Sequence, residues 1–165
     1  MKSAGRGTGQ PMGGRAMREI DTIIVHWSAT PAGWYAARPV EDVLAEIDRM
    51  HRERTPPFRM VGYHCLIHKP GTSIQGREDS AVGAHAVGHN ATSLGVCVIG
   101  GPNDPWTPEQ WAALEAYIHE KKALYGIKDD RILGHRDMPG AATLCPGRNI
   151  PAWWSLRRTH GGTVL

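Results

Sequence analysis

Three side chains of the kinds that bind zinc stand where turns of the chain are expected. His26 ends an apolar run, His135 follows the apolar residues 132–133 and a glycine, and Cys145 begins a Cys-Pro-Gly segment. Two imidazoles and a thiolate suit Zn²⁺, and three protein ligands leave the fourth tetrahedral position open, as in catalytic zinc sites. Spacing alone does not show that they meet. A buried histidine, an exposed histidine and an inert cysteine remain the alternative interpretation.

The composition limits the classes of protein to which the chain can belong. Its 165 residues correspond to about one domain, and 41% hydrophobic residues are enough for one core. Three cysteines without a Cys-x-x-Cys pair exclude a disulfide-rich scaffold and a structural zinc finger. No apolar run reaches the ~20 residues that span a bilayer, so membrane insertion is not expected. Nine histidines beside a single phenylalanine point instead to proton or metal chemistry.

The charge and the two ends of the chain carry less information. A net charge of +3 is too small to predict nucleic-acid binding, but it suits a polyanionic surface such as a cell-wall polymer. Residues 1–18 are rich in glycine and basic residues and lack the apolar segment of a secretory signal. We therefore expect synthesis in the cytoplasm without a signal peptide, with residues 1–18 as a flexible extension and residues 159–165 as a C-terminal tail.

Alternating strands and helices must position the three candidate ligands. Apolar and β-branched runs predict buried strands at residues 20–26 and 94–99. Apolar residues three and four apart predict a helix from Val40 that is stopped by Pro56. A capping box of Thr107 and Gln110 begins a second helix, which ends before Gly126. Shorter strands are expected at residues 61–68, 72–75 and 131–133, and a short helix at residues 151–158.

This order of elements predicts an α/β fold. Residues 19–158 form one domain, with a central mixed β-sheet flanked by helices. His26 then stands at the end of one strand and His135 just after another, and Cys145 lies in a loop.

Five segments of the chain, in order, carry a resemblance to a known family. They resemble the zinc-dependent N-acetylmuramoyl-L-alanine amidases of the type 2 group, which includes phage endolysins similar to T7 lysozyme and animal peptidoglycan recognition proteins. The resemblance extends over about residues 20–154. The segments are Val-His-Trp-Ser-Ala-Thr at 25–30, Gly-Tyr-His at 62–64, Ala-Val-Gly-Ala-His-Ala at 81–86, Leu-Gly-Val-Cys-Val-Ile-Gly at 94–100, and the stretch from Gly-His-Arg-Asp to Thr-Leu-Cys-Pro-Gly at 134–147.

The resemblance implies roles for individual residues. It places His26, His135 and Cys145 on one Zn²⁺ per chain, and it makes Tyr63 a catalytic residue. Thr143 stands where phage members often have lysine and recognition-protein amidases have threonine. A hydroxyl can donate one hydrogen bond to a developing oxyanion but brings no positive charge, so the role of Thr143 stays open.

Other residues near these segments are candidates for binding substrate. His85 is expected as a substrate contact or as a support for a ligand, and Asn90 follows in the same loop. Trp27 is a candidate for stacking on sugars, with packing as the alternative. His64 should face away from Tyr63, because successive residues of a strand point to opposite faces. Asp137 is expected either to orient His135 or to pair with Arg136, and solvated positions are expected for His51, His119 and His160.

The expected activity is hydrolysis of the amide between N-acetylmuramic acid and L-Ala of peptidoglycan. Such an enzyme would lyse the cell wall after release from the cytoplasm, as a phage or prophage endolysin does, and we expect a monomer. One alternative is a non-catalytic peptidoglycan-binding module, although such relatives typically lack the cysteine ligand. Another is a cytoplasmic amidase that recycles muropeptides, although those often have aspartate there. A Cys-His hydrolase is disfavoured, because Cys65 and Cys97 lie in apolar strands.

Overall fold

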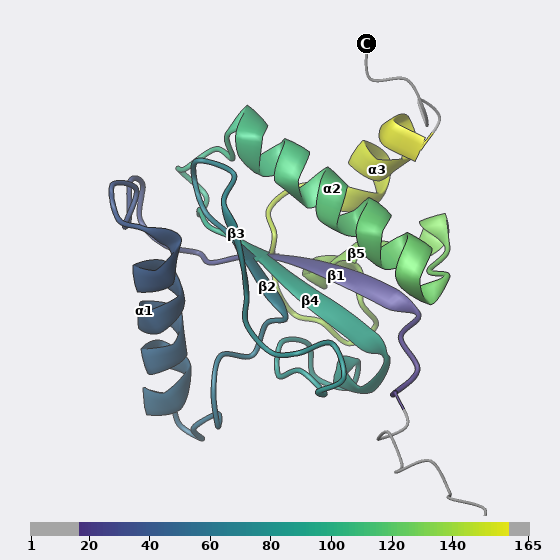
Figure 1. Cartoon of the computed structure of the whole chain (residues 1–165), viewed down its shortest axis with the longest axis horizontal. Helices are drawn as coiled ribbons and strands as arrows, with labels where there is room; N and C mark the ends of the chain where they lie inside the picture. Colours follow the sequence, from purple (N-terminus) through teal and green to yellow (C-terminus); the bar gives the residue numbers. More distant parts are fainter. Residues whose placement is uncertain (1–16, 159–165) are drawn as a thin grey trace, which may run out of the picture.

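The computed structural model describes residues 17–158, and these form an α/β domain built on a mixed sheet (Figure 1). The strand order is β3-β2-β4-β1-β5, and all neighbours are parallel except β2 and β3, which form an antiparallel pair. This confirms the predicted fold class. The strands are β1 (Thr22–Trp27), β2 (Cys65–Ile67), β3 (Ser73–Gln75), β4 (Ser93–Val98) and β5 (Ile132–Gly134).

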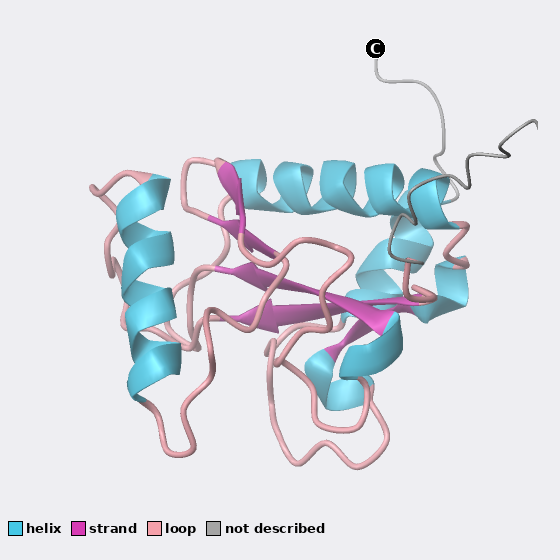
Figure 2. Cartoon of the chain, turned by 60° about the horizontal axis from the view of Figure 1, so that its bottom comes forward, coloured by secondary structure: helices cyan, strands magenta, loops and turns pink. Residues whose placement is uncertain are grey.

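Helices cover both faces of the sheet, α1 (Val40–Glu53) on one side and α2 (Pro108–Tyr125) with α3 (Ile150–Arg158) on the other (Figures 1 and 2). The alternation of side chains along β1 divides the core between these faces. Ile23 and Val25 pack with α2 and α3, whereas Ile24 lies on the opposite face. His26, one residue before the end of β1, shares that opposite face with Ile24. The same alternation therefore fixes the side of the sheet on which a site can form.

Most predicted elements are present, and the main difference lies before β2. A strand was expected from residue 61, but it begins only at Cys65. Gly62 packs so closely on the loop beyond β3 that an added Cβ would lie 2.1 Å from the Ala84 carbonyl oxygen. The Gly62 carbonyl also accepts a hydrogen bond from the amide of Ala84 rather than from a neighbouring strand. This contact holds Tyr63 beside the loop. Three 3-10 turns, at Asn90–Thr92, Asp129–Arg131 and His135–Asp137, were also not predicted.

Arg18, which directly precedes the predicted domain, is hydrogen-bonded to residues of that domain. The Arg18 guanidinium donates hydrogen bonds to the carbonyl oxygens of Asp79, Asn90, Ala91 and Ser93 at 2.8–3.2 Å. Arg18, which was expected to belong to the flexible extension, thus binds the segment that leads into β4. The rest of that extension and the predicted tail lie outside the described residues, apart from Met17.

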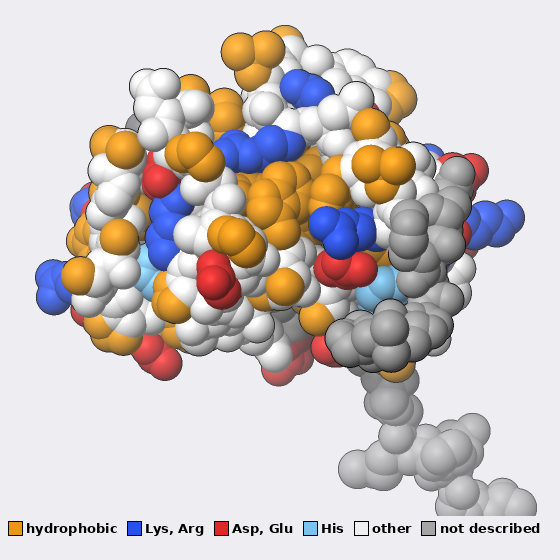
Figure 3. Space-filling model, turned by 90° about the horizontal axis from the view of Figure 1, so that it is seen from above, with side chains coloured by type: hydrophobic (Ala, Val, Ile, Leu, Met, Phe, Trp, Pro, Cys, Tyr) orange, Lys and Arg blue, Asp and Glu red, His pale blue; other side chains and the backbone are white. Residues whose placement is uncertain are grey.

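A shallow aromatic groove runs between α2 and α3. Trp106, Trp111 and Trp153 line it, with ring centroids 4.8 and 4.9 Å apart in successive pairs. Seen from above, hydrophobic side chains lie in a hollow between basic ones on this face (Figure 3). None of the helices in the described range is long and apolar enough to cross a membrane.

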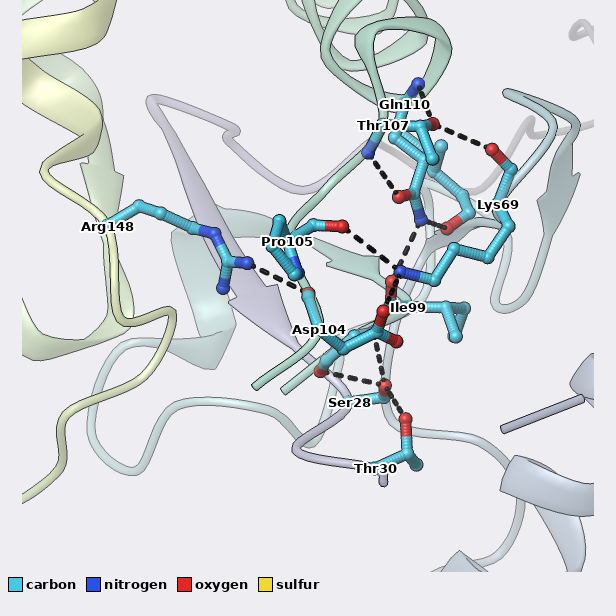
Figure 4. Close-up of polar contacts among 11 residues, drawn as sticks. Ser28, Thr30, Lys69, Ile99, Asp104, Pro105, Thr107, Gln110 and Arg148 are labelled. Carbon is cyan, nitrogen blue, oxygen red and sulfur yellow. Dashed lines mark hydrogen bonds and ion pairs between the residues drawn. The ribbon is translucent and has the colours of Figure 1, made fainter. Parts of the chain in front are cut away.

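Gln110 ties the start of α2 to the sheet (Figure 4). Its side chain is fully buried, and its Oε1 accepts from the Thr107 amide at 3.0 Å while the Thr107 hydroxyl accepts from the Gln110 amide at 3.1 Å. This is the predicted capping box. The Gln110 Nε2 also donates to the carbonyl oxygens of Ile67 and Ile99 at 3.3 and 2.8 Å. The side chain of Gln110 therefore forms hydrogen bonds with backbone groups of the helix cap, of β2 and of the segment after β4.

We expect Gln110→Ala to lower the free energy of unfolding by about 2–4 kcal/mol, because it removes the cap and leaves a buried cavity with unpaired polar groups. Urea unfolding at neutral pH measures this. The control is Glu109→Gln, an exposed neighbour in the same helical turn, for which a change within about 0.5 kcal/mol is expected. Equal stabilities of the two variants would contradict the role of Gln110.

Candidate active site

The three predicted ligands meet at one point of the structure. Ligand atoms of His26, His135 and Cys145 all lie within 4.8 Å of one another, and the His26 Nδ1 is 3.7 Å from the Cys145 Sγ. In a tetrahedral zinc site, bond lengths of ~2.0 and ~2.3 Å place a nitrogen and a sulfur ligand about 3.5 Å apart. The donor set and its spacing therefore fit a metal ion such as zinc.

Backbone contacts bring the ligands together from distant parts of the chain. His26 lies on β1, and β5 pairs with β1 in parallel, so that His135 emerges beside it at the start of a 3-10 turn. The loop with Cys145 is held across these ends, because the Arg136 amide donates to the Cys145 carbonyl at 2.7 Å and the Trp27 amide donates to the Sγ at 3.4 Å. Every ligand is thus fixed by the sheet or by a segment bonded to it.

Asp137 has a different partner from those expected. Its Oδ2 accepts a hydrogen bond from the Gly134 amide at 2.7 Å and closes the 3-10 turn that begins at His135. The carboxylate therefore acts on the backbone that presents His135, rather than on its ring or on Arg136.

His135 lines a cavity of about 460 Å³, whereas His26 and Cys145 are buried behind it. Segments within residues 54–63, 84–90 and 135–143 line it, together with the last turn of α1. Its lining includes Tyr63, His85, Asn90, His135 and Thr143. Trp27 is not among the lining residues that the structure describes. Its ring packs on Gly147, where an added Cβ would come within 2.3 Å of it.

Tyr63 lies beside the first ligand, with its ring centroid 5.1 Å from that of His26. Burial raises the pKa of the Tyr63 hydroxyl well above its ordinary value, and the nearby thiols of Cys97 and Cys145 act in the same direction. The phenol is therefore a neutral hydrogen-bond donor at neutral pH. The Cys97 side chain, which packs on this side of the sheet from β4, belongs to the same cluster as the Tyr63 ring.

The backbone amide of Cys145 orients the Thr143 hydroxyl. Its Oγ1 accepts a hydrogen bond from the Cys145 amide at 3.1 Å. Because that bond uses only the oxygen as an acceptor, the hydroxyl proton of Thr143 is free to be donated elsewhere. Thr143 lines the cavity, so this donor can serve a group bound there.

Burial also sets the protonation of the ligands. Desolvation lowers the pKa of His26 and of His85 well below the ordinary value of histidine, and neighbouring histidines add to the effect. Both imidazoles are therefore neutral at neutral pH. Burial raises the pKa of the Cys145 thiol to about 11, although the Trp27 amide opposes this.

His51 is a site residue that the sequence interpretation missed. It was expected to be solvated, but it lines the cavity and its ring centroid lies 5.4 Å from that of Tyr63. The His51 Nδ1 accepts a hydrogen bond from the Gly62 amide at 2.8 Å. The signal was present in the sequence, since His51 continues the i, i+4 spacing of the buried residues Val43 and Ile47. The His64 Nδ1 accepts a hydrogen bond from the Gly95 amide at 3.0 Å, and its ring centroid lies 5.7 Å from that of His85.

An α/β domain with three side chains that could hold a metal ion, and a neutral phenol at a nearby cavity, has the features expected of a hydrolase. Comparison with known proteins makes this class specific. The model of the N-acetylmuramoyl-L-alanine amidase family matches residues 16–148. The chain belongs to this family and is an N-acetylmuramoyl-L-alanine amidase.

Individual relatives agree with this assignment. The chain is 34% identical over 142 residues to the endolysin of Enterobacteria phage K11, an alignment that covers 82% of this chain and 86% of the endolysin. Among solved structures, it is similar to the amidase LysC from Clostridium intestinale, with a TM-score of 0.72 and 28% identity over 86% of this chain and 87% of that one. Drosophila PGRP-LB is similar with a TM-score of 0.71 and 25% identity, over 84% of this chain and 81% of that one.

Proposed function

We propose that the chain is a zinc-dependent endolysin that cleaves the amide between N-acetylmuramic acid and the first L-Ala of the peptidoglycan stem peptide. The observation that carries this proposal is the convergence of His26, His135 and Cys145 within 4.8 Å at the cavity that Tyr63 and Thr143 line. The similarity to a phage endolysin supports lysis of the cell wall as the biological result.

Zinc is the metal that the donor set favours. Two neutral imidazoles and one thiolate are typical zinc ligands, whereas calcium and magnesium prefer oxygen. When bound there, the ion would supply Lewis acidity that polarises the scissile carbonyl and lowers the pKa of water. Because the Cys145 thiol is protonated in the metal-free protein, binding of the ion would release a proton.

The side chains of the cavity would orient the reacting groups. Tyr63 keeps its proton at neutral pH, so it can donate a hydrogen bond to the oxygen that becomes negative as the amide is attacked. Thr143 can donate a second bond to the same oxygen, because its own oxygen is already held by the Cys145 amide. Neither residue brings a charge, and the stabilisation therefore depends on their positions.

The proposal extends to binding of peptidoglycan and to the site of action. His85 and Asn90 line the cavity, but substrate contacts by these residues and by Trp27 stay predictions. We further propose that the protein is made in the cytoplasm, acts as a monomer and reaches the wall after release.

Metal analysis combined with product analysis tests the proposed function. We expect about one zinc per purified chain, loss of peptidoglycan clearing after removal of the metal with a chelator, and recovery with added zinc. The digest should contain new amino groups on L-Ala and no new reducing sugar ends, because an amide and not a glycosidic bond is cut. Full clearing by metal-free protein would overturn the zinc dependence, and new reducing ends would overturn the cleaved bond.

A further inference from the structure

His85 forms the middle of a series of hydrogen bonds that begins at a proposed zinc ligand. The His26 Nε2 lies 2.9 Å from the His85 Nδ1, and the His85 Nε2 lies 3.2 Å from the Ser93 Oγ. The Ser93 hydroxyl in turn donates to the His89 carbonyl oxygen at 2.7 Å. Both ring nitrogens of His85 are thus used inside the protein.

The last bond fixes the direction of all the others. Ser93 has one hydroxyl proton, and a carbonyl oxygen can only accept, so this proton points to His89. The Ser93 oxygen must then accept from His85, which carries its proton on Nε2. A neutral His85 has a free electron pair on Nδ1, which accepts from the Nε2–H of His26. The neutral His26 is left with its own free pair on Nδ1, the atom that lies 3.7 Å from the Cys145 Sγ.

The ring of His85 is held in this orientation from several sides. An added Cβ on Gly95 or on Gly83 would come within 2.5 or 2.6 Å of the ring, so the two glycines leave room for it and nothing larger. The backbone is fixed as well, because the Asn90 Oδ1 accepts from the amides of His85 and Ala86 at 2.9 and 3.0 Å. Such close packing limits rotation of the ring and keeps its nitrogens aligned.

We propose that His85 and Ser93 are positioning residues that hold His26 in the tautomer with a free Nδ1 and thereby set the affinity of the site for zinc. The proposal rests on the zinc dependence proposed above. It assigns His85 to the ligand rather than to the substrate. Hydrogen bonds from a metal-binding histidine to a second residue typically change metal affinity by 10–100-fold.

Zinc affinity, measured by competition with a chelating dye, tests the role of His85. In His85→Leu the acceptor for His26 is lost while the volume is roughly kept, so we expect binding weaker by about 10–100-fold. In His85→Asn the Oδ1 takes the place of Nδ1 and can accept the same bond, so most of the affinity should return. Equal affinities of wild type and His85→Leu, or no recovery in His85→Asn, would overturn the proposal.

Nitrogen NMR of the metal-free protein tests the tautomer without any metal. We expect the His26 proton on Nε2 in the wild type and a mixture of tautomers in Ser93→Ala, with no change in the exposed control Ser80→Ala. A His26 proton on Nδ1 in the wild type, or an unchanged single tautomer in Ser93→Ala, would contradict the series. If the wild type bound no zinc, the proposed zinc dependence would fail, and the tautomer measurement would still decide the direction of the hydrogen bonds.

Discussion

Replacing Cys145 with serine is expected to weaken zinc binding by at least about 10³-fold and to reduce peptidoglycan clearing in the same proportion. The thiol supplies the soft ligand of the group, and a serine hydroxyl does not lose its proton readily enough to replace it. The overall structure should persist, because the loop is held by the bond from the Arg136 amide to the residue-145 carbonyl, which serine retains. Zinc titration and a turbidity assay on purified peptidoglycan measure the two losses.

The matched control is Cys65→Ser, which removes another buried thiol from β2 on the face of α2 and α3. This variant should lose some stability but keep wild-type zinc content and clearing, because Cys65 lies away from the three ligands. A Cys145→Ser protein that is folded by circular dichroism and still clears peptidoglycan at the wild-type rate would exclude Cys145 from the mechanism.

Tyr63→Phe should separate metal binding from turnover. The ring remains beside His26, so zinc content should equal that of the wild type, whereas loss of the hydroxyl should lower kcat by about 10²–10³-fold. This is the size of effect found when one donor to a developing oxyanion is removed. Kinetics on a soluble muropeptide give kcat and KM separately, and KM should change little.

Thr143→Val provides the comparison for this experiment, since it removes the second neutral donor at the same cavity. We expect a smaller loss of kcat than for Tyr63→Phe, because an aliphatic hydroxyl is less acidic than a phenol and is therefore the weaker hydrogen-bond donor. Wild-type kcat in Tyr63→Phe would remove the phenol from the proposed mechanism.

Much of the fold was visible in the sequence because it depends on local patterns. The apolar run of β1 and the spacing of apolar residues in α1 each extend over several residues. The capping box of α2 follows from Thr107 and Gln110, which are three residues apart. The group of candidate metal ligands, in contrast, depends on contacts between distant parts of the chain. His26 and Cys145 are 119 residues apart, and no period or spacing links such a pair. It was found only because the neighbouring residues resemble a known family.

The residues that the sequence did not reveal are those whose roles come from tertiary contacts. Arg18 stands in a glycine-rich segment with no periodicity, and its bonds reach carbonyl groups more than sixty residues away. The 3-10 turn after β5 depends on one bond from the Gly134 amide to Asp137. The position of His85 between Ser93 and His26 likewise depends on the pairing of β1 with β4. His51 is the exception, because the helix pattern already placed it on the buried face of α1.

The aromatic groove between α2 and α3 has an optical consequence. Its three indoles lie within energy-transfer distance of one another. They are on the opposite face of the sheet from the cavity, and the described lining of the cavity contains no tryptophan. Intrinsic tryptophan emission therefore reports chiefly on whether α2 and α3 are docked. Occupation of the cavity would alter this emission mainly through Trp27, whose amide bonds to the Cys145 sulfur, and Trp34, which packs in the same cluster as Tyr63. In this protein, fluorescence is thus a sensor of folding far more than of substrate.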